Sequence, residues 1–85
     1  MADDPPEVAG YLAFANRNCA GNDLKAIWAD SPEDCSLRCN AMPECEAIVF
    51  YYFRANPPWF CYLKRQCLEE HLYWDGSLDV YMKLG

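Results

Sequence analysis

Six cysteines in a chain of only 85 residues constrain the fold more than any other feature of the sequence. A domain this small buries a thin hydrophobic core and usually needs covalent or metal cross-links. An even number of cysteines in a short chain predicts three disulfides, formed in an oxidising compartment. The spacings Cys35-x3-Cys39-x5-Cys45 and Cys61-x5-Cys67 lack the close Cys-x2-Cys pairs of most structural zinc sites, and the chain has a single histidine. Disulfides are therefore favoured over a metal.

The length and charge of the chain indicate one small acidic domain. We expect residues 1–7 to form a disordered leader and residues 8–85 to form a single domain. The net charge of −6 argues against nucleic-acid binding, which needs clustered basic residues. The longest apolar run covers residues 47–53, far short of the roughly 20 residues of a transmembrane helix.

The first residues do not resemble a signal peptide, because they are acidic and proline-rich where a basic start and an apolar stretch are needed. With disulfides expected, we interpret the chain as secreted. It is either a mature secreted protein or a module excised from a larger secreted or cell-surface protein. In the second case Met1 is an added start residue.

The hydrophobic pattern predicts one helix and five strands, which gives an α+β domain with an antiparallel sheet packed against the helix. Ser31 and Pro32 mark the start of the helix, with Asp34 three residues after the cap. The helix should run from Pro32 to about Ala41, and Pro43 should end it. The strands are expected over residues 8–16, 24–29, 46–53, 59–64 and 78–84, and residues 66–76 are expected to form a loop.

The second half of the chain resembles the PAN/apple domain family. The resemblance rests on the helix with Cys35-x3-Cys39, the following Pro43-Glu44-Cys45, the strand at residues 47–52 and the Cys61-Tyr62-Leu63-Lys64 segment. Gly76 ahead of Val80-Tyr81-Met82-Lys83 completes the string. The similarity covers about residues 11–84, nearly the whole chain, and is strongest over residues 31–64.

This resemblance implies a nested disulfide pattern, whereas the sequence alone allows fifteen pairings of six cysteines. The implied pairs are Cys39–Cys45, Cys35–Cys61 and Cys19–Cys67. In apple-type members the outer bond ties the ends of the domain together, but Cys67 here lies well before the last strand. The two inner pairs are compatible with a helix whose cysteines, four residues apart, point to one face.

No catalytic or cofactor-binding pattern is present in the sequence. All six thiols are expected to be in disulfides, so none remains as a nucleophile. His71 is the single histidine, directly after Glu69 and Glu70, and is interpreted as a solvated surface residue. The acidic residues Glu69, Glu70, Asp75 and Asp79 do not follow the EF-hand spacing, so we expect acidic surface and no calcium site. We therefore expect a non-enzyme with no cofactor and no metal.

Thirteen aromatic residues are the remaining distinctive feature. Five lie on expected strands and are predicted to be core: Phe14, Trp28, Phe50, Tyr52 and Phe60. Others lie in or beside loops, where aromatic rings stack on sugars or insert into protein pockets, unless they merely cover a thin core. The candidate ligand-binding patch comprises Arg54, Trp59, Tyr62, Tyr73, Trp74 and Asp75.

The resemblance implies a non-catalytic extracellular module that binds a protein or a carbohydrate, as in adhesion proteins, proteases and receptors. The acidic chain disfavours heparin-like ligands, since Arg54, Lys64 and Arg65 offer only a small basic cluster. The alternative is a free-standing disulfide-rich effector, such as a protease inhibitor or toxin. The sequence leaves the oligomeric state and the choice between protein and glycan open.

Overall fold

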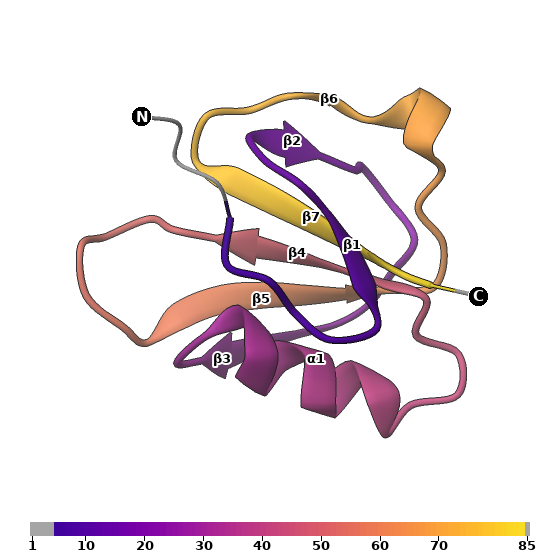
Figure 1. The fold of residues 1–85 in the computed structure, drawn as a ribbon, viewed down its shortest axis with the longest axis horizontal. Helices are drawn as coiled ribbons and strands as arrows, with labels where there is room; N and C mark the ends of the chain where they lie inside the picture. Colours follow the sequence, from indigo (N-terminus) through magenta and orange to yellow (C-terminus); the bar gives the residue numbers. More distant parts are fainter. Residues whose placement is uncertain (1–4, 85) are drawn as a thin grey trace.

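The computed structural model describes residues 5–84 and contains a five-stranded antiparallel sheet, one α-helix and a small two-stranded sheet (Figure 1). The predicted α+β fold class is confirmed. The large sheet has the strand order β1-β7-β4-β5-β3, and β2 pairs with β6 in the small sheet. Within residues 5–84, no helix is long and apolar enough to cross a membrane. The elements are β1 (Tyr11–Phe14), β2 (Arg17–Asn18), β3 (Asp23–Ala29), α1 (Pro32–Asn40), β4 (Ala47–Tyr51), β5 (Trp59–Lys64), the 3₁₀ turn η1 (Glu69–His71), β6 (Tyr73–Trp74) and β7 (Leu78–Lys83).

Helix α1 begins where the sequence predicts and ends one residue earlier. The Oγ of Ser31 accepts a hydrogen bond from the Asp34 amide at 3.0 Å, and Pro32 occupies the first turn. This arrangement satisfies one of the amides that a helix start leaves unpaired. At the other end, the Nζ of Lys83 donates to the carbonyl of Cys45 at 2.6 Å, which ties the helix exit to β7.

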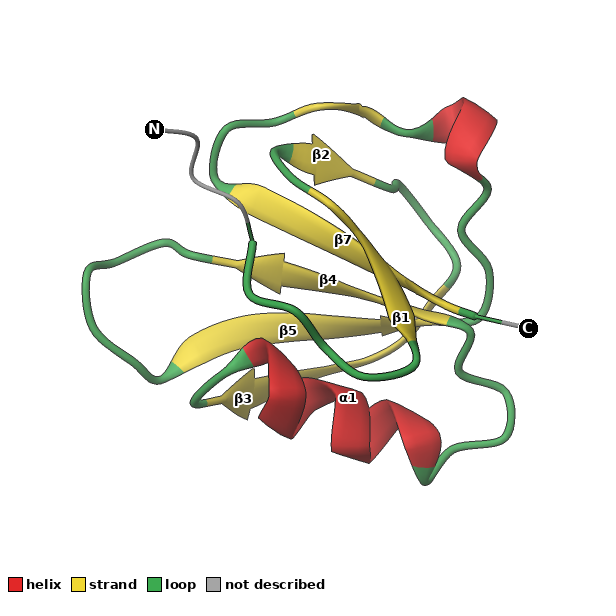
Figure 2. Cartoon of the chain, viewed as in Figure 1, coloured by secondary structure: helices red, strands yellow, loops and turns green. Residues whose placement is uncertain are grey.

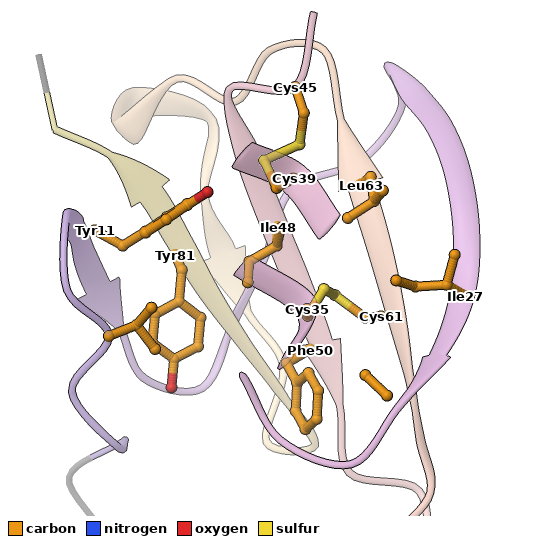
Figure 3. Packing of buried hydrophobic residues seen from close by; sticks show 12 residues of the cluster. Tyr11, Ile27, Cys35, Cys39, Cys45, Ile48, Phe50, Cys61, Leu63 and Tyr81 are labelled. Atoms are coloured by element: carbon orange, nitrogen blue, oxygen red, sulfur yellow. A yellow bond between two sulfur atoms is a disulfide. The ribbon is translucent and has the colours of Figure 1, made fainter. Parts of the chain in front are cut away.

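The main core lies between α1 and the sheet (Figure 3). Ile48 and Phe50 of β4 and Tyr81 of β7 are fully buried there. The disulfides Cys35–Cys61 and Cys39–Cys45 join the helix to β5 and to the segment before β4. Four sulfur atoms thus fill a core that would be thin without them.

A second, smaller core lies on the opposite face of the sheet, which we call the helix-free face. The side chains of Val49, Leu78 and Val80 point to it because neighbouring strand residues alternate between faces. The disulfide Cys19–Cys67 packs over them and joins the chain after β2 to the chain after β5. All three pairings are those that the family resemblance implies.

Three local expectations from the sequence are wrong. The first strand does not start at Val8, because Val8 to Tyr11 form a turn in which Gly10 has a φ of +84°. The expected loop at residues 66–76 contains η1 and β6, and β6 is the return strand that pairs with β2 (Figures 1 and 2). The expectation for Trp28 is corrected below.

Trp28 is not a core residue, since 51% of its surface is exposed. In β3 the alternation of side chains sends Ile27 and Ala29 toward the helix and places Trp28 on the helix-free face. β3 is also an edge strand, so nothing beyond it covers the indole. Of the other aromatics predicted as core, Phe50 is buried, whereas Phe14, Tyr52 and Phe60 are half-buried.

Candidate functional site

The helix-free face is covered unevenly, and this leaves a cleft. The segments joined by Cys19–Cys67 pack over β4 and β7, while the side toward β5 and β3 stays open. At the boundary lies a cleft of about 320 Å³, which we call the tyrosine cleft. Its lining residues are Asn18, Cys19, Ala20, Gly21, Asp23, Tyr51, Tyr62, Lys64, Tyr73, Asp75, Ser77 and Leu78.

Three tyrosines from different strands converge on this cleft. Tyr51 comes from β4, Tyr62 from β5 and Tyr73 from β6. The side-chain Nδ2 of Asn18 donates a hydrogen bond to the Tyr73 hydroxyl at 2.7 Å, so the pairing of β2 with β6 positions this ring. The cleft therefore offers both aromatic faces and hydroxyl groups to a ligand.

Lys64 forms the floor of the cleft beside Tyr62. Its Nζ lies 2.6 Å from Oδ1 of Asp23 and 3.0 Å from the carbonyl oxygen of Gly21. Only 5% of the lysine side chain is exposed, whereas 56% of the Asp23 side chain is. Lys64 is thus a buried cation whose charge is balanced at the wall of the cleft.

The cleft is also lined by a second fixed carboxylate, that of Asp75. Oδ1 of Asp75 accepts hydrogen bonds from the amide and the hydroxyl of Ser77, at 3.2 and 3.0 Å. The Asp75 amide in turn donates to the carbonyl of Asn16 at 3.0 Å. A carboxylate held this way keeps acceptor capacity for a donor on a ligand.

A row of aromatic rings extends from the cleft to the sheet edge, and we call its outer part the edge patch (Trp28, Phe53, Phe60 and Arg54). Trp28 stacks on Phe60, and the ring of Phe53 packs against both. The Arg54 guanidinium lies 5.2 Å from the centre of the Phe53 ring and 5.8 Å from that of Trp28. Tyr51 contacts Phe53, which makes the edge patch continuous with the cleft.

The structure divides the ligand-binding residues that the sequence predicts. Tyr62, Tyr73 and Asp75 line the cleft, and Arg54 belongs to the edge patch. Trp59 instead packs edge-on against Phe50 and Tyr52 on the helix side of the sheet. Its indole N–H donates to the carbonyl of Arg54 at 2.7 Å, so it supports the loop before β5.

Trp74 is 68% exposed but does not line the cleft. Adjacent residues of a strand point to opposite sides, so the β2–β6 pairing that turns Tyr73 inward turns Trp74 outward. There the Arg17 guanidinium lies 5.8 Å from the indole. The exposure of Trp74 therefore does not by itself indicate a role in binding at the cleft.

Sequence reasoning missed Tyr51, Asp23 and Asn18 as cleft residues. Tyr51 lies in an apolar run in which no residue is distinguished by its type. Asn18 and Asp23 lie in a polar stretch typical of a loop. They meet because β2 lies beside β7 and Asp23, at the start of β3, pairs with Lys64 of β5. The alternation of β4 was the one usable signal, since it sends Tyr51 to the same face as Val49.

A second hollow, of about 280 Å³, lies at the start of β7 and is lined in part by Asp79. Oδ1 of Asp79 accepts a hydrogen bond from the Asn16 amide at 2.9 Å. Burial raises the pKa of this carboxyl above its ordinary value, and the hydrogen bond opposes part of the rise. Burial likewise raises the pKa of the neighbouring Tyr52 to about 12.

Among residues 5–84, no three His, Cys, Asp or Glu side chains are grouped to hold a metal ion. His71 is exposed in η1, apart from the tyrosine cleft. The described side chains of the cleft offer ring faces, hydroxyls, amides and carboxylates. These groups can stack on a ligand and exchange hydrogen bonds with it.

Comparison with known families gives one match. A family model described as "PAN domain" matches residues 17–64, more than half of the chain. The matched region spans β2 to β5 and includes five of the six cysteines and Lys64. No curated protein and no solved structure shows significant similarity to the chain.

Proposed function

The chain belongs to the PAN domain family, and we propose that it is a non-catalytic recognition module that binds a carbohydrate in the tyrosine cleft. PAN domains in general are binding modules for proteins or carbohydrates. The observation that carries the proposal is the convergence of Tyr51, Tyr62 and Tyr73 with two carboxylates in one cleft.

These groups match the two kinds of surface that a sugar presents. The C–H faces of a pyranose ring are apolar and stack on aromatic rings, while its hydroxyls donate to carboxylate and amide oxygens. Asp23 and Asp75 both line the cleft, so the hydroxyls of a sugar ring would find carboxylate acceptors there. A volume of about 320 Å³ is at the small end of ligand pockets, which favours one or two sugar units.

Three disulfides support an extracellular location. Such bonds form and persist in oxidising compartments, and small secreted domains depend on them. We therefore propose that the module belongs to a secreted protein or to the ectodomain of a cell-surface protein.

A second candidate function is protein binding through the edge patch. Trp, Tyr and Arg dominate the energetics of protein interfaces, and Trp28 and Arg54 adjoin each other at an open sheet edge. Substituting Trp28 with Ala would weaken a protein complex at this patch. The same substitution would not change the affinity for a sugar that contacts only the tyrosine cleft.

A glycan array run beside a pull-down from extracellular fluid tests the proposal. We expect a defined set of glycans to bind, and Tyr73→Phe to weaken them about fivefold or more through the lost hydroxyl. Trp74→Ala is the matched control, because it alters the adjacent ring that points away, and it should bind as the parent does. A parent chain that binds no glycan but retains a protein partner lost on Trp28→Ala would contradict the proposal and favour the second candidate.

A further inference from the structure

The cation in the floor of the tyrosine cleft has an unusual setting. Lys64 is almost wholly buried, yet its ammonium group lies at a cleft that a ligand could enter. A buried lysine beside tyrosine hydroxyls and an asparagine amide would ordinarily favour an anion, because each of these groups can donate a hydrogen bond to it. Whether Lys64 can bind an anion depends on the groups with which its ammonium already interacts.

The ammonium group of Lys64 is already paired with the Asp23 carboxylate and with a backbone carbonyl. The carboxylate lies 2.6 Å from Nζ, and the carbonyl of Gly21 accepts at 3.0 Å. The ring of Tyr62 lies 5.9 Å away and shields the same ammonium group. The ion pair cancels the positive charge where a ligand would meet it, and the exposed part of Asp23 adds negative potential.

The remaining charge of the cleft is also negative. The Asp75 side chain accepts only from Ser77 among its described contacts, so no cation is paired with its charge there. Lys64 is the sole basic residue among those that line the described cleft. The charged side chains that line the cleft thus sum to −1, and an anionic ligand would find the one cation already paired.

We propose that the cleft is selective for uncharged saccharides, and that Asp23 sets this selectivity by holding Lys64 in an ion pair. This inference rests on the proposed function of the cleft as a carbohydrate site. It goes further in assigning the exclusion of sulfated and carboxylated sugars to one residue. Asp23 is a positioning residue here, because it acts on an anion through Lys64 as well as by its own charge.

The test replaces Asp23 by Asn, which keeps the shape of the side chain and an oxygen acceptor for Lys64 but removes the charge. The probe is a sulfated heparin disaccharide, titrated at low salt and followed by calorimetry and by the NMR shifts of Tyr62 and Tyr73. The parent should show no binding in the cleft. Asp23→Asn should show saturable binding, with a Kd at least about tenfold below the highest concentration at which the parent shows none, the gain typical of one charge-assisted hydrogen bond.

Two variants separate this effect from the general loss of a negative charge. Asp30→Asn makes the same change just beyond the other end of β3, outside the cleft, and should not bind the probe more tightly. Asp23→Asn combined with Lys64→Met should lose the gain, while Asp23→Glu should retain the exclusion. Thermal midpoints and near-ultraviolet circular dichroism identify the folded variants.

The result that overturns the inference is a parent chain that binds the sulfated probe with Tyr62 and Tyr73 perturbed. An Asp23→Asn gain no larger than that of Asp30→Asn also overturns it. These outcomes are distinct from failure of the proposed function. That failure appears as a lack of binding to every neutral glycan, whatever the variants do with the anion.

Discussion

The indole of Trp28 lies nearly parallel to the ring of Phe60, with the ring centres 4.2 Å apart and the planes inclined by 24°. These residues are direct cross-strand partners of β3 and β5 on the helix-free face. Because β3 is the edge strand, one face of the indole packs on Phe60 and the rest remains exposed. The pair closes the row of rings that begins in the tyrosine cleft.

The exposure of Trp28 predicts a small effect on stability. Trp28→Ala should lower the free energy of unfolding by about 1–2 kcal/mol, since the indole pairs with two rings, those of Phe60 and Phe53. Phe50→Ala is the comparison, because Phe50 is fully buried, and its loss should cost about 3–5 kcal/mol. Urea unfolding of both variants provides the measurement. Equal losses in the two would show that Trp28 belongs to the core.

The three disulfides predict that reduction unfolds the domain. The bonded cysteines are separated by 6, 26 and 48 residues. Taken singly, such loops correspond to about 2.4, 3.6 and 4.1 kcal/mol of stabilisation in the chain-entropy model. A small domain has a net stability of about 5–15 kcal/mol, so losing all three bonds should remove the folded state. A reduced chain that keeps its thermal midpoint and near-ultraviolet signal would contradict this.

Asp79 predicts a pH dependence with a definite sign. A carboxyl whose pKa is raised by folding holds its proton more tightly in the folded state. The protonated Asp79 carboxyl therefore contributes to the free energy of unfolding in full below pH 3.8, the ordinary pKa of this group. This contribution is lost as the pH rises through the raised pKa of the folded state.

The variant Asp79→Asn tests this sign, since it keeps the acceptor for the Asn16 amide and removes the charge. Its stability relative to the parent should be greater at pH 7 than at pH 3, as measured by urea unfolding at both values. A stability difference between variant and parent that is equal at the two pH values, or one that shifts in favour of the parent toward pH 7, would contradict a destabilising buried charge at Asp79.

The sequence predicts those parts of the fold that depend on local chemistry. Ser31 and Pro32 fix the start of α1 through a cap and a fixed φ angle, which neighbouring residues alone determine. The apolar and aromatic run at residues 47–51 predicts β4 because its content of β-branched and aromatic side chains suits a buried strand. These elements needed no knowledge of the rest of the chain.

The site depends on contacts between distant segments, and the sequence predicts it only in part. The β2–β6 pair has two residues on each side, too few for a recognisable pattern, yet it determines that Tyr73 faces the cleft and Trp74 does not. The outward direction of Trp28 follows from the register of β3 against β5, which no local rule specifies. The pairing of Lys64 with Asp23 joins residues 41 positions apart in the sequence.

A two-dimensional ¹H–¹⁵N NMR titration with a neutral saccharide chosen from the glycan array tests the central claim most directly. The account predicts saturable shifts confined to the tyrosine cleft, above all at Tyr51, Tyr62 and Tyr73, with α1 unchanged. Shifts that cluster on the exposed side of α1, or no saturable shift with any glycan, would contradict it.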